Sequence, residues 1–142
     1  MSEVSIREFI FPDDYLVCAS LWKNSAPGVV FAQSDAPDEI QKKLNYAPEL
    51  FLVAEFQDQV VGTVIGGYDG RRGMLYHLAV TKEMQGKGIG RSLLAEVEKR
   101  LRARGCRKCY LMLTPDNLSK LDFYRKSGWD LMDVTVLGNE FK

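Results

Sequence analysis

The chain has 142 residues, of which 46% are hydrophobic and 27% are charged. This length buries enough apolar surface for a domain to fold alone, and the composition excludes a largely disordered protein. No apolar run reaches the ~20 residues that cross a bilayer, and no basic stretch followed by an apolar run opens the chain, so we expect a cytoplasmic protein without a membrane partner.

The formal charge is zero overall but is unevenly distributed. Residues 1–60 hold ten acids and four bases, whereas residues 61–142 hold fifteen bases and nine acids. A basic second half favours an anionic ligand such as a nucleotide phosphate, and an acidic first half tolerates a cationic amine. Solvated faces that bind nothing explain the same distribution equally well.

Strand and helix signals alternate in the N-terminal third of the chain. Residues 4–9 alternate apolar and polar side chains, which predicts a strand. Pro12 opens a helix, and the stretch 24–34, which contains a Pro-Gly pair, predicts a loop. Asp35 is expected to cap a second short helix that ends at about Tyr46.

An antiparallel meander is predicted for the middle of the chain. The apolar runs 50–56 and 60–68 are separated by a short polar stretch, which is typical of a hairpin. A turn at 69–73 leads to a third strand over 74–80. This succession differs from the strand-helix alternation of a doubly wound fold.

A long helix is predicted from about Gly88 to Arg104. An apolar stripe recurs along it at helical spacing, and a glycine that follows two arginines marks its end. The stripe consists of Ile89, Leu93, Leu94, Val97 and Leu101.

The C-terminal part supplies the last predicted elements. Residues 110–113 predict a buried strand, Asn117 is expected to cap a fourth helix, and residues 129–137 predict a final strand. The resulting order is β-α-α-β-β-β-α-β-α-β. No repeat or linker interrupts it, so we expect one domain over residues 1–142, with an α/β (α+β) fold in which helices flank a mixed, mostly antiparallel sheet.

Three glycines, Gly86, Gly88 and Gly90, lie between the end of a strand and the start of the long helix. Without side chains they let backbone N–H groups converge on an anion, and the helix dipole adds partial positive charge. The spacing differs from the dinucleotide fingerprint, and Lys87 precedes Gly88, so this is no Walker loop. A glycine-rich turn without a ligand is the alternative.

The context of this turn resembles the acetyl-CoA signature of the GNAT family of N-acetyltransferases. Residues 78–80 are followed by Gln85, Gly88 and Gly90. The family pattern is an Arg or Gln, two residues, a Gly, one residue, and a Gly or Ala.

A second, separate motif resembles the same family. Asn117 precedes Tyr124, and Gly128 and Trp129 follow at the end of the predicted helix. The order of elements also agrees, so the resemblance covers essentially the whole chain. The stretch 52–70 further resembles a small bacterial member of the family.

The resemblance implies an acyltransferase that moves an acetyl group from acetyl-CoA to an amine by direct attack in a ternary complex. Tyr124 would be the catalytic acid that protonates the departing CoA thiolate. The strand 78–80 would bind the pantetheine arm, with one of its amides facing the developing oxyanion. The implied cofactor-binding residues are Leu78, Ala79, Val80, Gln85, Gly86, Lys87, Gly88, Ile89, Gly90, Arg91 and Asn117.

The general base is harder to identify. Family members commonly carry a glutamate in one of two strands, but the corresponding residues 74–80 and 110–113 contain no carboxylate. His77, Glu55, Asp116 and a water chain are the candidates, and His77 fits equally well as a packed strand residue.

Two further patterns are expected to be structural. Cys106 and Cys109 form a C-x-x-C pair that follows a helix and enters a strand, which disfavours a redox or zinc site, so no metal is expected. The basic cluster between Lys99 and Lys108 lacks interleaved aromatic residues, so no nucleic-acid partner is expected.

The predicted partner is therefore a small-molecule or peptide amine, and a homodimer is compatible with the sequence. The alternative function is a non-catalytic acyl-CoA-binding sensor or subunit.

Overall fold

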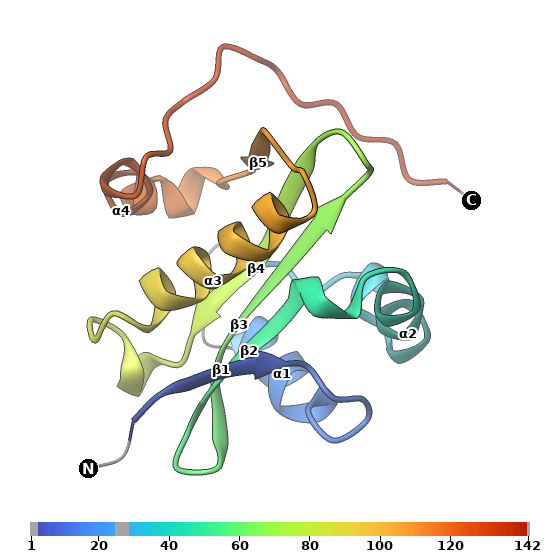
Figure 1. The fold of residues 1–142 in the computed structure, drawn as a ribbon, viewed down its shortest axis with the longest axis vertical. Coiled ribbons are helices and arrows are strands. Elements are labelled where there is room, and N and C mark those ends of the chain that lie inside the picture. The colour runs from blue at the N-terminus through green and yellow to red at the C-terminus, as the bar shows by residue number, and fades with distance from the viewer. Residues whose placement is uncertain (1–2, 25–28, 142) are drawn as a thin grey trace.

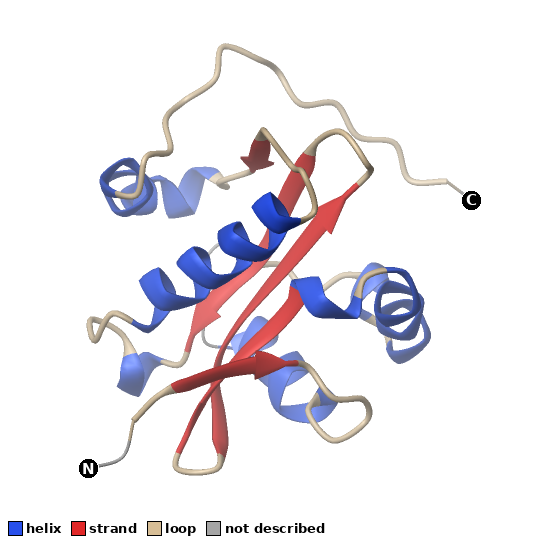
Figure 2. Ribbon diagram, in the orientation of Figure 1, coloured by secondary structure: helices blue, strands red, loops and turns tan. Residues whose placement is uncertain are grey.

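The computed structural model describes residues 3–24 and 29–141, so part of the loop predicted at 24–34 lies outside the described residues. A five-stranded sheet has the order β1-β2-β3-β4-β5 (Figures 1 and 2). Its first four strands are antiparallel neighbours, and β5 lies parallel to β4, which confirms the predicted mixed sheet. The strands are β1 (Ser5–Glu8), β2 (Phe51–Phe56), β3 (Gln59–Tyr68), β4 (Gly73–Val80) and β5 (Cys109–Leu111).

Helices cover both faces of this sheet. The long α3 crosses one face diagonally, and α1 lies against the other (Figure 1). The α-helices are α1 (Tyr15–Asn24), α2 (Pro37–Tyr46), α3 (Ile89–Ala103) and α4 (Leu121–Lys126). Short 3₁₀ helices connect the elements: η1 (Gln33–Asp35), η2 (Pro48–Leu50), η3 (Lys82–Met84) and η4 (Pro115–Lys120). Within the described ranges no helix is both long and apolar enough to cross a membrane.

The predicted hairpin is confirmed. Gln57 and Asp58 connect β2 to β3 and have φ of 51° and 62°. Two consecutive residues with positive φ are typical of the tight turn whose twist suits a two-residue hairpin.

The core has two layers, one on each face of the sheet. Successive residues of β2 alternate between them: Leu52 and Ala54 join the cluster under α3, while Phe51 and Val53 join the cluster under α1 and α2. All four are fully buried. A two-residue period with both faces buried accounts for the uninterrupted apolar run of this strand.

The packing of α3 against the sheet depends on two glycines of β3. A Cβ at Gly62 would lie 3.0 Å from Leu93 Cδ1, and one at Gly66 would lie 2.9 Å from Val97 Cγ2. Every residue of the predicted apolar stripe of α3 is buried, so that prediction is confirmed. The glycines therefore let the helix approach β3 more closely than any side chain would allow.

The predicted last strand, 129–137, is wrong. No helix or strand is assigned from residue 129 to 141, and this segment arches away from the sheet (Figure 1). Leu131, Val134 and Leu137 are 64%, 66% and 89% exposed. The consecutive β-branched residues 134–136 favour an extended backbone, but a strand also needs a partner, and β5 pairs over only three residues.

Three local predictions at element ends also need correction. The first helix begins at Tyr15 because a hydrogen-bonded turn closes first, from Asp14 N–H to the Ile10 carbonyl at 2.9 Å. Asp35 does not cap α2, whose N-cap is Ala36 without a side-chain bond. The predicted strand 110–113 is shorter and runs over Cys109–Leu111.

The fourth helix does not begin at Asn117. Pro115 starts a 3₁₀ turn, and Asn117 lies inside it, with its N–H bonded to the Thr114 carbonyl at 2.9 Å. The α-helical geometry of α4 is reached only at Leu121, after Lys120 as N-cap.

Replacing Gly66 by alanine should destabilise the protein by about 1–3 kcal/mol, because the added methyl meets Val97 of α3 and neither group has a flexible end that can yield. Gly67→Ala is the matched control, since its Cβ would lie 3.8 Å from its nearest neighbours. Urea unfolding measures both. Equal free energies of unfolding for the two variants would show that the close approach of α3 is not a constraint.

Candidate active site

A cavity of about 510 Å³ lies where β4 ends and α3 begins. It brings together all the residues that the sequence predicted for the site except Lys87, whose side chain does not line it. Three further residues line it that the sequence analysis did not identify, and one of them, Lys120, lies four residues before Tyr124. The lining consists of Leu78, Ala79, Val80, Met84, Gln85, Gly86, Gly88, Ile89, Gly90, Arg91, Asn117, Lys120, Phe123 and Tyr124.

The glycine turn takes a backbone conformation that favours glycine. Gly86 and Gly88 have φ of 78° and 85°, and a Cβ at either would meet nothing within 4 Å. Gln85 holds this turn against the sheet, because its side-chain amide donates to the Val80 carbonyl at 2.9 Å. The turn therefore has a fixed shape and faces open space.

The N-terminus of α3 presents its backbone donors to the same space. Gly88 is the N-cap and makes no side-chain cap bond, and the first turn holds no acid. Within the part of the chain that the structure describes, the N–H groups of Ile89, Gly90 and Arg91 have no hydrogen-bond partner. Unpaired amides at the positive end of a helix dipole attract an anion.

One edge of β4 is also open towards the cavity. β5 pairs only with Gly73, Met74 and Leu75. Among the described residues, no strand pairs with β4 on that side from Tyr76 to Val80. An extended ligand can therefore bind there as an added strand.

A bulge precedes this open edge. Thr63 pairs with Ala79 and Ile65 pairs with Tyr76, so both His77 and Leu78 lie opposite Val64. His77 has a φ of 51°, which non-glycine residues seldom adopt. Bulges re-aim side chains and backbone groups, and they occur often beside active sites.

A buried chain of hydrogen bonds supports the bulge. The Trp22 indole N–H donates to the Thr63 hydroxyl at 3.0 Å, and that hydroxyl donates to the His77 carbonyl at 2.7 Å. Trp22 and Thr63 are almost fully buried. Trp22 is therefore part of the core.

Tyr124 of α4 lines the inner part of the cavity. Its ring packs edge-on against Phe123 and Trp129, and the residue is 8% exposed. Burial raises the pKa of its hydroxyl to about 12. The hydroxyl therefore keeps its proton at neutral pH and can act as a donor.

Residues 16–129 match the family model described as the acetyltransferase (GNAT) family. The chain belongs to the GNAT family. It is 40% identical over 126 residues to an acetyltransferase of Pectobacterium atrosepticum, covering 89% of this chain and 88% of that protein. An acetyltransferase of Sodalis glossinidius is 39% identical over 125 residues, covering 88% of this chain and 87% of that protein. The chain is thus an acetyltransferase, as the sequence predicted.

Solved structures of GNAT proteins share the fold. Ard1 from Thermoplasma volcanium superposes with a TM-score of 0.78 at 24% identity, covering 91% of this chain and 84% of that one. The PaiA N-acetyltransferase from Thermoplasma acidophilum, solved in complex with coenzyme A, gives a TM-score of 0.76 at 21% identity, covering 94% and 93%.

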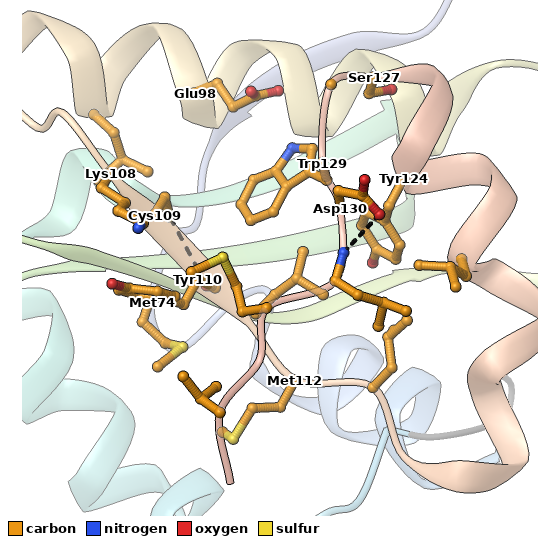
Figure 3. A pocket seen from close by; sticks show the side chains of 18 of the residues that line it. Met74, Glu98, Lys108, Cys109, Tyr110, Met112, Tyr124, Ser127, Trp129 and Asp130 are labelled. Carbon is orange, nitrogen blue, oxygen red and sulfur yellow. Dashed lines mark hydrogen bonds between the residues drawn. The ribbon is translucent and has the colours of Figure 1, made fainter. Parts of the chain in front are cut away.

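This GNAT protein has a second cavity, of about 700 Å³, which Tyr124 also lines (Figure 3). It lies between β5, the C-terminal half of α3, α4 and the segment after α4. Figure 3 shows Trp129 between Glu98 of α3 and Tyr110 of β5. Neither the glycine turn nor the free amides of α3 line it, so it lacks the backbone donors of the first cavity.

The C-x-x-C pair of this acetyltransferase borders the second cavity. Cys106 and Cys109 are free thiols, and burial raises the pKa of Cys109 to about 12. A thiol with such a pKa stays protonated and unreactive near neutral pH. In the described ranges, no group of three or more His, Cys, Asp or Glu residues is arranged to hold a metal ion.

Replacing Thr63 by valine should destabilise the protein by about 1–3 kcal/mol, because it leaves the buried Trp22 N–H without an acceptor and the His77 carbonyl without a donor. Thr135→Val, at an exposed position, is the control. Urea unfolding gives the comparison. Equal stability of the two variants would mean that the bulge does not depend on this hydroxyl.

Proposed function

We propose that this GNAT acetyltransferase, as one N-acetyltransferase domain over residues 1–142, transfers the acetyl group of acetyl-CoA to an amine by direct attack in a ternary complex. The observation that carries the proposal is the 510 Å³ cavity, in which an uncapped helix N-terminus, an open strand edge and a tyrosine hydroxyl meet. The helix N-terminus suits the pyrophosphate of acetyl-CoA, the strand edge suits the pantetheine amides, and the tyrosine hydroxyl suits the thioester. The donor and the amine acceptor are what the two experiments below test.

The pyrophosphate would bind at the glycine turn. The free amides from Ile89 to Arg91 offer hydrogen bonds, and Arg91 and Lys120 add positive charge. No carboxylate occurs among the described residues that line the cavity. A cation-rich lining with preformed donors is the arrangement that a diphosphate needs.

The pantetheine arm would lie along the open edge of β4. Its two amide groups can exchange hydrogen bonds with the backbone of Leu78, Ala79 and Val80, as an added strand does. Asn117 would contact the arm near its reactive end, because it lines the same cavity as Tyr124. The thioester would then lie close to both the bulge and the tyrosine.

In the reaction, the amine nitrogen attacks the thioester carbonyl carbon, and a C–N bond forms as the C–S bond breaks. A backbone N–H of the strand 78–80 would stabilise the oxyanion. Tyr124 would donate its hydroxyl proton to the departing sulfur.

The raised pKa of Tyr124 bears on this last step. A phenol with a pKa of about 12 would donate uphill to an ordinary thiolate, at a cost of about 5 kcal/mol. Burial, however, also raises thiol pKa values, as it does for Cys18, to about 12. In an equally dry site the sulfur becomes as basic as the phenolate, and the proton transfer is close to balanced.

Acetyl-CoA should raise the melting temperature of the protein by mass action.

Gly88→Ala should weaken acetyl-CoA binding about ten-fold or more, because alanine is strained in the left-handed conformation and its methyl group enters the space of the diphosphate. Gly70→Ala is the matched control: Gly70 has a φ of 97° and equally open surroundings, but lies in the β3–β4 turn.

Thermal-shift titration and calorimetry measure both variants. If acetyl-CoA leaves the melting temperature of the parent protein unchanged, acetyl-CoA is excluded as the donor.

Tyr124→Phe should lower the turnover number about a hundred-fold and leave acetyl-CoA affinity unchanged, because only proton donation is lost. Tyr46→Phe, at a position that is 74% exposed, is the control. The assay follows thiol release with spermidine, lysinamide, glucosamine and a peptide with a free N-terminus. Undiminished turnover in Tyr124→Phe would exclude the acid role, and thiol release with none of these amines would favour a non-catalytic acyl-CoA-binding module.

A further inference from the structure

We infer that Asp35 and His77 form the proton acceptor of this site: Nδ1 of His77 takes the proton that the substrate ammonium must lose before its nitrogen attacks. His77 is the catalytic residue of the pair and Asp35 is its positioning residue. This inference rests on the proposed function, since it presupposes an amine acceptor. The two residues are 42 positions apart in the sequence and meet across the fold.

The pair has a fixed geometry. His77 Nε2 lies 2.9 Å from Asp35 Oδ1, and the two side chains are 16% and 7% exposed. The other carboxylate oxygen, Oδ2, accepts the Ala32 N–H at 3.0 Å. The hydroxyl of Tyr15 donates to the Asp35 carbonyl at 2.8 Å and fastens the turn η1 to α1. Both carboxylate oxygens of Asp35 are therefore engaged.

This geometry selects one tautomer of the imidazole. An ionised carboxylate only accepts hydrogen bonds, so the hydrogen that Asp35 binds belongs to Nε2 of His77. The lone pair of the neutral ring is then on Nδ1, and no described residue bonds to that nitrogen. A carboxylate that orients an imidazole in this way is the arrangement by which His acts as a general base in hydrolases.

The position of His77 suits an amine that approaches from the face opposite the cofactor turn. Its ring lies 4.8 Å from that of Trp22, on the α1 face of the sheet, whereas the glycine turn leads into α3 on the other face. The next residue, Leu78, lines the cofactor cavity. Because consecutive Cα atoms are about 3.8 Å apart, the backbone of His77 adjoins the strand edge along which the thioester is proposed to bind.

The surroundings of the pair favour a cation. Burial, together with the negative charges of Asp35 and Asp38, raises the pKa of the Tyr15 hydroxyl, so this group stays a neutral donor. β3 contributes the uncharged Thr63, which bonds to the His77 carbonyl. The carboxylates of Asp35 and Asp38 thus lie near the pair, and their negative charge attracts an ammonium ion.

The other candidate bases are engaged elsewhere. Glu55 accepts two hydrogen bonds from the Arg7 guanidinium, at 2.9 and 3.2 Å, between β1 and β2. Asp116 accepts a hydrogen bond from the Thr114 hydroxyl in η4.

The left-handed backbone at His77 costs free energy that packing elsewhere must offset, and such strain clusters at functional sites.

The protons balance as follows. The ammonium gives one proton to Nδ1 of His77, and the free amine attacks the thioester carbon. As the C–S bond breaks, Tyr124 gives its hydroxyl proton to the sulfur. The second proton of the amine nitrogen then replaces that proton on Tyr124. The imidazolium then releases its proton to water, so the products are an acetamide, the CoA thiol and one proton.

The tautomer can be observed directly, because His77 is the only histidine in the chain. Long-range ¹H–¹⁵N NMR of the untagged protein at alkaline pH should give one imidazole, with the proton on Nε2 and an unprotonated Nδ1. Asp35→Asn should shift the tautomer ratio of that ring. A neutral ring protonated on Nδ1 in the parent protein would overturn the inference, whether or not acetyl transfer is detected.

Kinetics test the base role. Asparagine tolerates positive φ, so the His77→Asn variant should keep the bulge and its affinity for acetyl-CoA. With spermidine at pH 7, kcat/KM should fall about a hundred-fold, and the low-pH limb of the pH profile should move. With methoxyamine, which is already neutral at pH 7, the same variant should lose less than about three-fold.

An equal loss with both acceptors would mean that His77 is only structural. His77→Gly, which also tolerates the φ, gives a second readout, because added imidazole should restore transfer to spermidine. No rescue by imidazole, together with an equal loss of activity towards both acceptors, would exclude His77 as the base. If the parent protein binds acetyl-CoA but acetylates no amine of the panel, the proposed function fails, and the NMR result still decides the protonation state of the pair.

Discussion

The close approach of α3 to β3 is the contact on which the site depends. Gly62 and Gly66 face the helix at successive turns, and an added Cβ would lie 3.0 Å from Leu93 and 2.9 Å from Val97. This contact fixes the axis of α3, so its uncapped N-terminus begins directly beyond the end of β4. The proposed anion site is thus a consequence of core packing, and the glycine turn only connects two elements whose positions are already set.

The bulge in β4 adds the second constraint. It places one extra residue opposite Val64 just where β5 stops pairing, so the outer half of β4 has an open edge. It also turns His77 towards α1 while Leu78 lines the cofactor cavity. In this account the two faces of one strand serve two substrates, with the acyl donor on the α3 side and the amine on the α1 side. The buried hydroxyl of Thr63 connects the two faces of the strand, because it binds the carbonyl of His77 between them.

Local sequence rules predicted the features that depend on nearest neighbours. The hairpin, the stripe of α3 and the glycine turn follow from periodicity and from the special conformations of glycine. The prediction of a C-terminal strand was wrong because a strand also needs a partner, which the apolar and β-branched residues within 129–137 do not reveal. The Asp35–His77 contact has no sequence signal, since each residue lies in a separate element and only the packing of η1 over β4 brings them together. Asp35 looked like a helix cap because its carboxylate suits either role.

The most direct test of the whole account is a crystal structure of the protein with coenzyme A. The account predicts the diphosphate on the amides of Gly86 to Arg91, the pantetheine arm paired with Leu78 to Val80, and the sulfur within hydrogen-bond reach of the Tyr124 hydroxyl. The imidazole of His77 should lie on the opposite side of the sulfur from α3. Coenzyme A bound in the cavity beside Trp129, or with its sulfur away from both Tyr124 and the β4 bulge, would contradict the account.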